Sequence, residues 1–297
     1  MQQQVKNTIP VYDICSLADT RHLREDITAE GLAHYLQRQK DLRFPHRHSF
    51  YHLVYFTEGS GKHSIDFETF RVEPGQVYFM IPGQVHSWHF EGRIDGYVIN
   101  FSEQLMHSFL KEGQYLEQFP FFSGIAAEGV VTLGDARMEV EQLLARVVAE
   151  AAGDAPMAGE MIRIYLLSIF ITVLRDMPVQ DKKQAPGHSH LLLRNFRKLV
   201  EQYYAAKRLP KEYAAMLYIT PNHLNALCND LLGRSAGEVI RDRVLLEAKR
   251  LLVGHGISVA EIAWQLNFSD NSYFTKFFKK YTGMTPEQFR ARPESEK

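Results

Sequence analysis

The chain has 297 residues, 45% of them hydrophobic, and its formal net charge at pH 7 is −1. This length predicts two domains, each with its own core, and the near-neutral charge by itself argues against a nucleic-acid partner. The chain has only two cysteines, Cys15 and Cys228, and no basic-then-apolar signal peptide, so we expect a cytoplasmic protein without disulfides. We find no phosphate loop or nucleophile motif, and we therefore predict no catalytic residue and no enzyme.

Short apolar segments separated by glycine and proline fill the region from Ser49 to Phe101. This pattern predicts an antiparallel sandwich or barrel, with its core at about residues 43–103. The predicted strands are Tyr51–Thr57, Lys62–Phe67, Val77–Ile81 and Gly96–Phe101.

Histidines recur within this region at a spacing that can bind zinc, iron or nickel. His46-x-His48-x-x-x-His52 is followed by Gly59, and Gly75 precedes Pro82-Gly83-x-x-His86. These segments resemble the two cupin motifs, with His52 where cupin enzymes have glutamate and Phe90 where asparagine is common. Because the glutamate is absent, we favour neither a bound metal nor any cofactor. If a metal binds, its candidate ligands are His46, His48, His52 and His86.

Aromatic and polar side chains in the same segment favour a pocket for a small effector, since such pockets combine apolar walls with a few polar anchors. The alternative for most of the aromatic residues is a place in the barrel core. The candidate pocket residues are Arg47, His48, Tyr55, Tyr78, Trp88 and Arg93.

Two amphipathic segments, 136–152 and 159–175, predict helices after the barrel. The second is apolar nearly all round but too short to span a membrane, so we expect it under the barrel or against a second subunit. Residues 178–190 are polar with two prolines and a glycine, as in a linker. The predicted domains are therefore 1–177 and 191–297.

The last part of the chain carries one helix pattern twice, at Ala214–Gly233 and at Ala263–Gly283. In each copy a short apolar helix, a tight turn and a second helix follow one another, which predicts a helix-turn-helix. The expected N-caps, Thr220 and Ser269, lie at the same distance from the first alanine of each copy. Each copy ends at a glycine that runs into a capping box.

A continuous helical pattern over Ala236–Val253 joins the two copies. At this length the helix extends about 27 Å, not far below the roughly 34 Å between successive major-groove faces of DNA. Charge supports the same interpretation once the chain is divided. Residues 188–297 hold 17 basic and 11 acidic residues, net +6, whereas residues 1–187 are net −7.

Several spaced motifs over about residues 190–290 resemble the DNA-binding domain of AraC/XylS-type transcription regulators. They are the run at 243–252 that ends in Ala-Lys-Arg-Leu-Leu, Ser258-Val-Ala-Glu-Ile-Ala263, Asn267-Phe-Ser-Asp270-x-Ser-Tyr-Phe274-x-x-x-Phe278-Lys-Lys280 and Gly283-x-Thr-Pro286-x-x-Phe-Arg290. The resemblance implies a seven-helix domain with two helix-turn-helix units. It also implies a cupin-like sensor barrel, commonly without a metal, and a dimer formed through the helices after it.

Two features depart from that family. Asn267 stands where glycine is usual, and asparagine is the least costly substitute in a left-handed turn. The first reading helix has Cys228, Asn229 and Asp230 where the family often has an aromatic followed by basic residues. We therefore expect the first unit to contribute less DNA affinity than the second.

Helix geometry predicts which side chains face DNA. The candidates for base contact are Asn222, His223, Asn225, Ala226, Asn271, Ser272, Thr275 and Lys276. The candidates for phosphate contact are Lys279, Lys280 and Arg290.

The expected protein is a multidomain α+β regulator, with a cupin-like barrel and two helices before an all-α domain of two helix-turn-helix units. Its expected partners are double-stranded promoter DNA, a small-molecule effector, a second copy of the chain and RNA polymerase, with no membrane. An activator is favoured. The alternatives are a cupin-type metalloenzyme with a DNA-binding tail, and a regulator whose barrel serves only dimerisation or protein contact.

Overall fold

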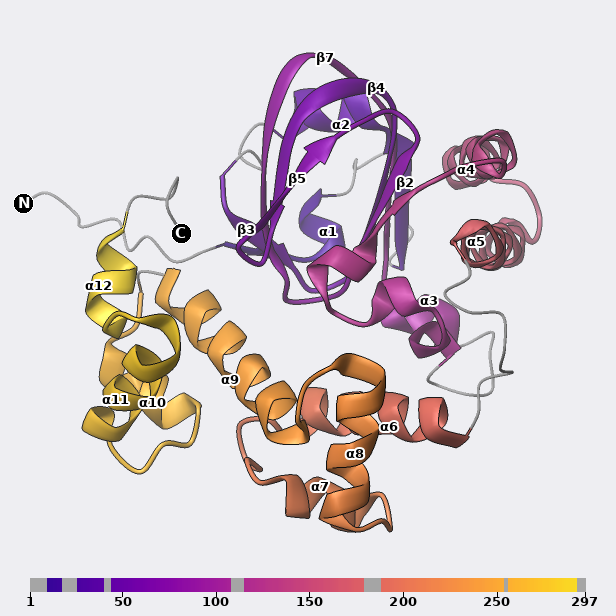
Figure 1. Ribbon diagram of the computed structural model, residues 1–297. Coiled ribbons are helices and arrows are strands. Elements are labelled where there is room, and N and C mark those ends of the chain that lie inside the picture. Colours follow the sequence, from indigo (N-terminus) through magenta and orange to yellow (C-terminus); the bar gives the residue numbers. More distant parts are fainter. Residues whose placement is uncertain are drawn as a thin grey trace, which may run out of the picture. The chain divides into compact units, whose positions relative to one another are not determined.

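The computed structural model describes residues 10–17, 26–39, 44–107, 115–178, 188–253 and 256–292. Its contacts divide the chain into two compact units, Pro10–Val179 and Gln180–Lys297 together with Met1–Ile9. The first unit is a strand-rich barrel with helices and the second is helical (Figure 1). The predicted fold class is thus confirmed.

Eight strands form one sheet in the first unit, in the order β1-β3-β7-β4-β6-β8, with β2 paired to β7 and β5 paired to β4. Every pairing is antiparallel except the one between β1 and β3. The strands are β1 (Val11–Tyr12), β2 (Ile27–Gly31), β3 (His46–His48), β4 (Tyr51–Ile65), β5 (Glu68–Val72), β6 (Gln76–Met80), β7 (Val85–Phe101) and β8 (Val130–Thr132). The sheet therefore extends beyond the predicted core at both ends.

The two longest strands differ from the prediction. The predicted strands Tyr51–Thr57 and Lys62–Phe67 are separated at Gly59-Ser60-Gly61, but β4 runs through this segment, with register irregularities against β7 between Phe56 and Ser60. Gly61 and Gly96 permit close approach of the two strands, because a Cβ on Gly61 would lie 2.3 Å from the His89 carbonyl oxygen and one on Gly96 1.9 Å from that of Tyr55. The glycines therefore bend paired strands around the barrel instead of ending them.

Alternation along the strands gives the sheet two apolar faces. One face holds what we call the interior cluster, which includes Val54, Phe56, Tyr78, Met80, Trp88 and Val98. The other holds the outer cluster, which includes Leu53, Tyr55, Phe79, Ile99 and Phe101. Because both faces are covered, the sheet has a core on each side.

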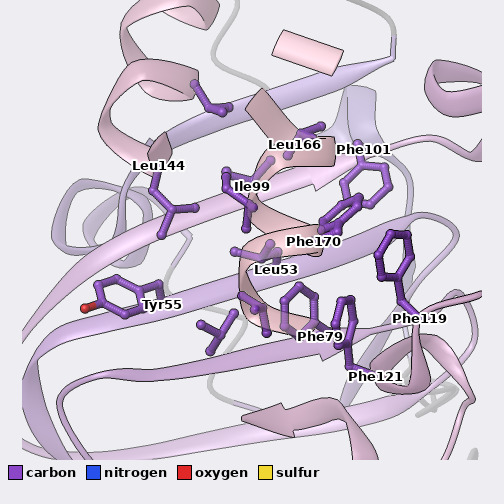
Figure 2. Packing of buried hydrophobic residues seen from close by; sticks show 14 of the residues in the cluster. Leu53, Tyr55, Phe79, Ile99, Phe101, Phe119, Phe121, Leu144, Leu166 and Phe170 are labelled. Carbon is purple, nitrogen blue, oxygen red and sulfur yellow. The ribbon is translucent and has the colours of Figure 1, made fainter. Parts of the chain in front are cut away.

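Two helices, α4 (Arg137–Ala152) and α5 (Ala158–Asp176), pack on the outer cluster (Figures 1 and 2). Figure 2 shows Phe170 of α5 among the aromatic rings of Phe101, Phe119 and Phe121, whereas Leu144 of α4 lies toward Tyr55 and Ile99. The predicted helices are therefore present, and the second lies on the barrel, which is one of the two expected alternatives. No helix in the described part of the chain is long and apolar enough to cross a membrane.

Shorter elements complete this unit. They are α1 (Ile14–Leu17), α2 (Leu32–Arg38), α3 (Glu103–His107) and the 3-10 turns η2 (Tyr115–Gln118), η3 (Pro120–Phe122) and η4 (Ala126–Gly129). The η2 and η3 turns add Leu116, Phe121 and Phe122 to the outer cluster.

The second unit consists of seven helices in its described residues, as the family resemblance implied. They are α6 (His188–Tyr203), α7 (Pro210–Met216), α8 (Pro221–Leu232), α9 (Ala236–Val253), α10 (Val259–Gln265), α11 (Asn271–Thr282) and α12 (Pro286–Ala291). The last three residues of the predicted linker are already helical in α6, and residues 179–187 lie outside the described part. The α9 helix lies between the two helix-turn-helix units (Figure 1).

Capping residues fix these helix ends. The Thr220 side chain accepts a hydrogen bond from His223 N, and Thr285 forms the capping box expected after Gly283. Ser258 forms another capping box at the start of α10. The N-cap of α11 is Asp270 and not the predicted Ser269, since the Asp270 carboxylate accepts from Tyr273 N at 2.7 Å. The second turn is thus one residue longer than the first, while α8 and α11 are both 12 residues long.

Both tight turns pass through a left-handed residue. Asn267 has φ 55°, as expected where the family usually has glycine, and Tyr218 has φ 56° at the matching place in the first unit. A left-handed backbone costs an ordinary L-residue about 1–2 kcal/mol, whereas asparagine tolerates it better. The Tyr218 side chain is 95% exposed, so packing does not offset this strain.

We therefore expect Tyr218→Gly to raise the free energy of unfolding by up to about 1 kcal/mol, because relief of strain exceeds the added flexibility of the unfolded chain. Asn267→Gly should change it by less than half as much. Urea unfolding of the two variants and the wild type provides the comparison. A destabilised Tyr218→Gly protein would contradict the assignment of strain to this turn.

Candidate nucleic-acid interface and histidine cluster

The two reading helices expose one polar face each and bury the other. Leu224, Leu227 and Cys228 are buried on α8, and Phe274 and Phe278 on α11. Most predicted contact residues lie on the exposed faces. The exposed ones are Asn222, His223, Ala226, Asn271, Ser272, Lys276, Lys279 and Lys280, and Thr275 is partly exposed.

Asn225 is a correction to this set. Its Oδ1 atom accepts a hydrogen bond from Ala236 N at 3.0 Å, at the first residue of α9. The Asn225 amide therefore satisfies a backbone donor at a helix start, and this role fixes α9 against α8. We no longer assign Asn225 to base contact.

Arg290 is a second correction. Its guanidinium donates to the Ile257 carbonyl oxygen at 2.8 Å, and the side chain is partly buried. This bond ties α12 to the segment before α10, so the predicted phosphate contact by Arg290 is withdrawn.

Basic charge reaches the surface unevenly in this unit. On α9, Arg243 contacts the carboxylates of Glu201 and Glu247, and Arg241 lies between Glu238 and Asp242. By contrast, α11 carries three exposed lysines and no acidic residue, whereas α8 carries Asp230 and no lysine or arginine. Of the two reading helices, α11 therefore carries the positive charge available to phosphates.

Arg208 connects the two helix-turn-helix units and was not found from the sequence. It precedes α7 in the first unit, and its guanidinium donates to the Leu266 carbonyl oxygen in the turn of the second. The same group lies 3.6 Å from the centre of the Phe268 ring. A planar guanidinium can make the bond and the stacking contact together, so Arg208 is a positioning residue for the two reading helices.

Replacing Arg208 by lysine tests this role, because lysine keeps the charge but loses the planar stacking. We expect Arg208→Lys to weaken binding to DNA that carries both half-sites about 10-fold, and to leave binding to a single half-site within about 2-fold. Electrophoretic mobility shifts on the two duplexes measure both. Equal loss on the two DNAs would show that Arg208 contacts DNA directly and does not position the units.

The structure divides the six candidate pocket residues. Tyr78 and Trp88 belong to the interior cluster, and His48 is buried on the same side of the sheet. Arg47 alternates with the two inward histidines of β3 and so faces away. Tyr55 lies in the outer cluster, where its hydroxyl donates to Glu141, and Arg93 is 76% exposed beside Glu58. Arg47, Tyr55 and Arg93 therefore do not line the interior.

Five buried histidines gather inside the barrel. His46 and His48 come from β3, His52 and His63 from β4, and His86 from β7, and each is at most 3% exposed. The four predicted candidates are thus brought together. His63 joins them because β4 stays paired with β7 up to Ile65, which lies opposite His86. Neighbouring rings lie close, with centroids 4.1 Å apart for His46 and His86 and 4.7 Å for His48 and His52.

Burial keeps these imidazoles neutral. Desolvation lowers the pKa of His46 to about 4 and that of His52 to about 3, and it also lowers the pKa of His48, His63 and His86. Each ring is therefore uncharged at neutral pH, which is the form that binds a metal ion or accepts a hydrogen bond.

Together these features define a two-domain regulator, in which one unit encloses polar groups in a barrel and the other presents two reading helices. Residues 31–170 match the AraC-like ligand binding domain, and residues 213–292 match a helix-turn-helix domain of the AraC type. The chain belongs to the AraC family of transcription regulators.

Curated relatives cover most of the chain. The HTH-type transcriptional activator RhaR of Salmonella typhi is 23% identical over 252 residues, which are 84% of this chain and 88% of that protein. The Msm operon regulatory protein of Streptococcus mutans is 22% identical over 244 residues, 81% of this chain and 84% of that protein. Among solved structures, ToxT from Vibrio cholerae is 12% identical and covers 90% of this chain and 98% of its own, with a TM-score of 0.45.

Proposed function

We propose that the protein binds promoter DNA through α8 and α11 and activates transcription in response to a small ligand held by the barrel. The single observation that carries this proposal is the pair of reading helices, equal in length and fixed to one unit by α9 and Arg208. Rigid spacing of two such helices suits adjacent major-groove segments on one face of a duplex.

The three α11 lysines support different roles in DNA binding for the two helix-turn-helix units. Lys276 lies toward the base-reading part of the helix, whereas Lys279 and Lys280 follow it toward the backbone. Asn222 and His223 on α8, and Asn271, Ser272 and Thr275 on α11, are the further base contacts that we propose. The second unit supplies most of the phosphate attraction, and the first adds sequence preference.

Control by a ligand rests on the barrel. Its interior combines aromatic rings with uncharged imidazoles, and its matched domain is a ligand-binding one. Activation is the role that the RhaR relatives carry in their name, and it implies contact with RNA polymerase. Since those relatives are regulators, we infer that this chain is not an enzyme. The rival view, a barrel that serves only dimerisation or protein contact, predicts no change in DNA binding or transcription with any small ligand.

A dimer through α4 and α5 would place two DNA-binding units on one promoter. Their outer surfaces expose Met138, Ile164 and Leu174, apolar side chains that a second copy could cover. Light scattering of the full chain tests this arrangement, and a charged residue at Ile164 should shift a dimer toward monomer without unfolding it.

Selection of bound duplexes from a random library tests the DNA proposal with no assumption about the operator sequence. We expect each chain to enrich two short conserved segments about 10 base pairs apart, and footprinting of a selected duplex should show protection of both on one face. Enrichment of a single segment, or of none, would contradict reading by two helices. Reporter transcription from a promoter with the selected site then distinguishes activation from repression.

A further inference from the structure

We propose that the barrel binds one divalent transition-metal ion through His46, His48 and His86. Binding would replace the hydrogen bond from Trp88 to His86 Nδ1 by one from His86 Nδ1 to His63. The inference concerns the barrel alone and does not depend on the proposed DNA contacts. It revises our preference from the sequence, which was for no metal.

The three ligands already lie together. One nitrogen of each of His46, His48 and His86 lies within 4.8 Å of the others, and all three rings are buried. Tetrahedral coordination at zinc–nitrogen bonds of about 2.05 Å places ligand nitrogens roughly 3.4 Å apart. Small side-chain rotations would close this difference.

Unpaired nitrogens support an ion at this place. His46 Nε2, both nitrogens of His48 and His86 Nε2 are buried and have no hydrogen-bond partner among the described residues. Leaving buried polar atoms unpaired costs stability, and each such group in a folded protein requires an explanation. A metal ion would satisfy one nitrogen of each ring at once.

Hydrogen bonds set which nitrogen is free. A backbone carbonyl can only accept, so the 2.8 Å contact from His46 Nδ1 to the Phe44 oxygen places the proton on Nδ1 and the lone pair on Nε2. His52 Nδ1 likewise donates to Asn100 Oδ1, because the Asn100 amide nitrogen donates to Thr28. Both rings thus have the tautomer typical of metal-binding histidines, and His52 offers a fourth lone pair beside His48.

His86 is set in the opposite way. Its Nδ1 accepts from the indole N–H of Trp88 at 2.8 Å, and this bond places the proton of the neutral ring on Nε2. An Nε2 that carries a proton cannot bind a metal. Coordination through Nε2, the nitrogen of His86 that has no partner among the described residues, therefore requires the proton to move to Nδ1, which would no longer accept from Trp88.

A new acceptor is already in place. His63 Nε2 lies 3.2 Å from His86 Nδ1 and can accept the hydrogen bond that the Nδ1–H group would then donate. The shift exchanges one tautomer of His86 for the other, and His63 then carries its own proton on Nδ1, so no net proton is gained or lost. The indole N–H of Trp88 is released. His63 acts as a positioning residue, and Trp88 reports the occupancy of the site.

Neutral imidazoles favour zinc, iron, nickel, cobalt or copper over magnesium or calcium, which prefer oxygen ligands. Co²⁺ is the practical probe because nitrogen coordination gives it a visible absorption band. The experiment uses the full chain without a histidine tag and with Trp264→Phe, which leaves Trp88 as the only tryptophan. We expect cobalt absorption and Trp88 emission to change together and to saturate at one ion per chain.

Three variants locate the site and its partner. His48→Gln with His86→Gln should abolish saturable binding, and His63→Gln should weaken it about 10–100-fold while leaving the absorption band in place. His89 lies on β7, as His86 does, but its side chain is exposed. His89→Gln is therefore the matched control and should bind the metal as the wild type does.

Weak, unsaturable binding, or tight binding unchanged in the double variant, would overturn the site. Saturable binding that leaves Trp88 emission unchanged would overturn the exchange at His86. DNA selection with the same variants distinguishes failure of the metal site from failure of the proposed function. A variant that loses metal binding but still selects the same DNA affects the barrel and leaves the proposed DNA contacts intact.

Discussion

Phe274→Ala should destabilise the DNA-binding unit by about 3–5 kcal/mol, the largest effect that we expect from a single substitution in this chain. The Phe274 ring is fully buried in a row of aromatic rings, with centroids 5.0 Å from Phe268 and 6.0 Å from Phe278. The row continues to Phe289, 5.5 Å from Phe278, so it joins the turn, α11 and α12. Removal of the ring leaves a cavity that rigid neighbouring helices cannot fill.

The measurement is urea unfolding of the full chain, with DNA affinity measured on the same preparations. Because domains are stable by only about 5–15 kcal/mol, a loss of this size should leave α11 poorly ordered and DNA binding strongly reduced. Tyr273→Ala is the matched control, since Tyr273 is the preceding residue on α11 but 56% exposed. Its cost should stay below about 1 kcal/mol. Equal costs for the two variants would contradict the buried aromatic row.

Lys276→Ala should change sequence preference, whereas Lys279→Ala should not. A lysine that donates to guanine acceptors is worth about 1–3 kcal/mol of discrimination, so Lys276→Ala should relax the preference at one base position about 5- to 150-fold. Lys279 lies farther along α11 and is proposed to meet phosphate. Its loss should weaken binding to every duplex and reduce the slope of log affinity against log salt by about 0.9.

Binding titrations at several salt concentrations, on a selected duplex and on duplexes with one changed position, measure both effects. Asn225→Ala is a useful third variant, because the structure gives that residue a role at the start of α9. It should lower stability and leave base preference unchanged. A change of preference in Asn225→Ala, or equal losses on all sequences from both lysine variants, would reject these assignments.

Local chemistry is the reason that so much of the DNA-binding unit can be predicted. Caps such as Thr220 and Ser258, the glycines that end α8 and α11, and apolar spacing all act within a few residues, so the sequence shows them directly. The left-handed conformation of Asn267 follows from the same local rules. The one-residue difference between the turns does not, because Ser269 and Asp270 are both good N-caps and local rules do not select between them.

The barrel shows the other case. Its strands and its two following helices are visible in the sequence, but the glycines of β4 also fit a turn, and only pairing with β7 makes the strand continuous. That pairing sets which residues share a face, and it separates Tyr55 from Tyr78. It also places His63 beside His86, although 23 residues separate them along the chain.

The sequence by itself determined the two-domain order, the duplicated helix-turn-helix and the family, because caps, periodicity and motif spacing are short-range properties. Only the tertiary structure decided that Arg208 joins the two units, that Asn225 and Arg290 serve the fold, and that five histidines meet in the barrel. These contacts join residues that lie far apart along the chain. The partner of each side chain is therefore set by the packing of the folded protein and not by its neighbours in sequence.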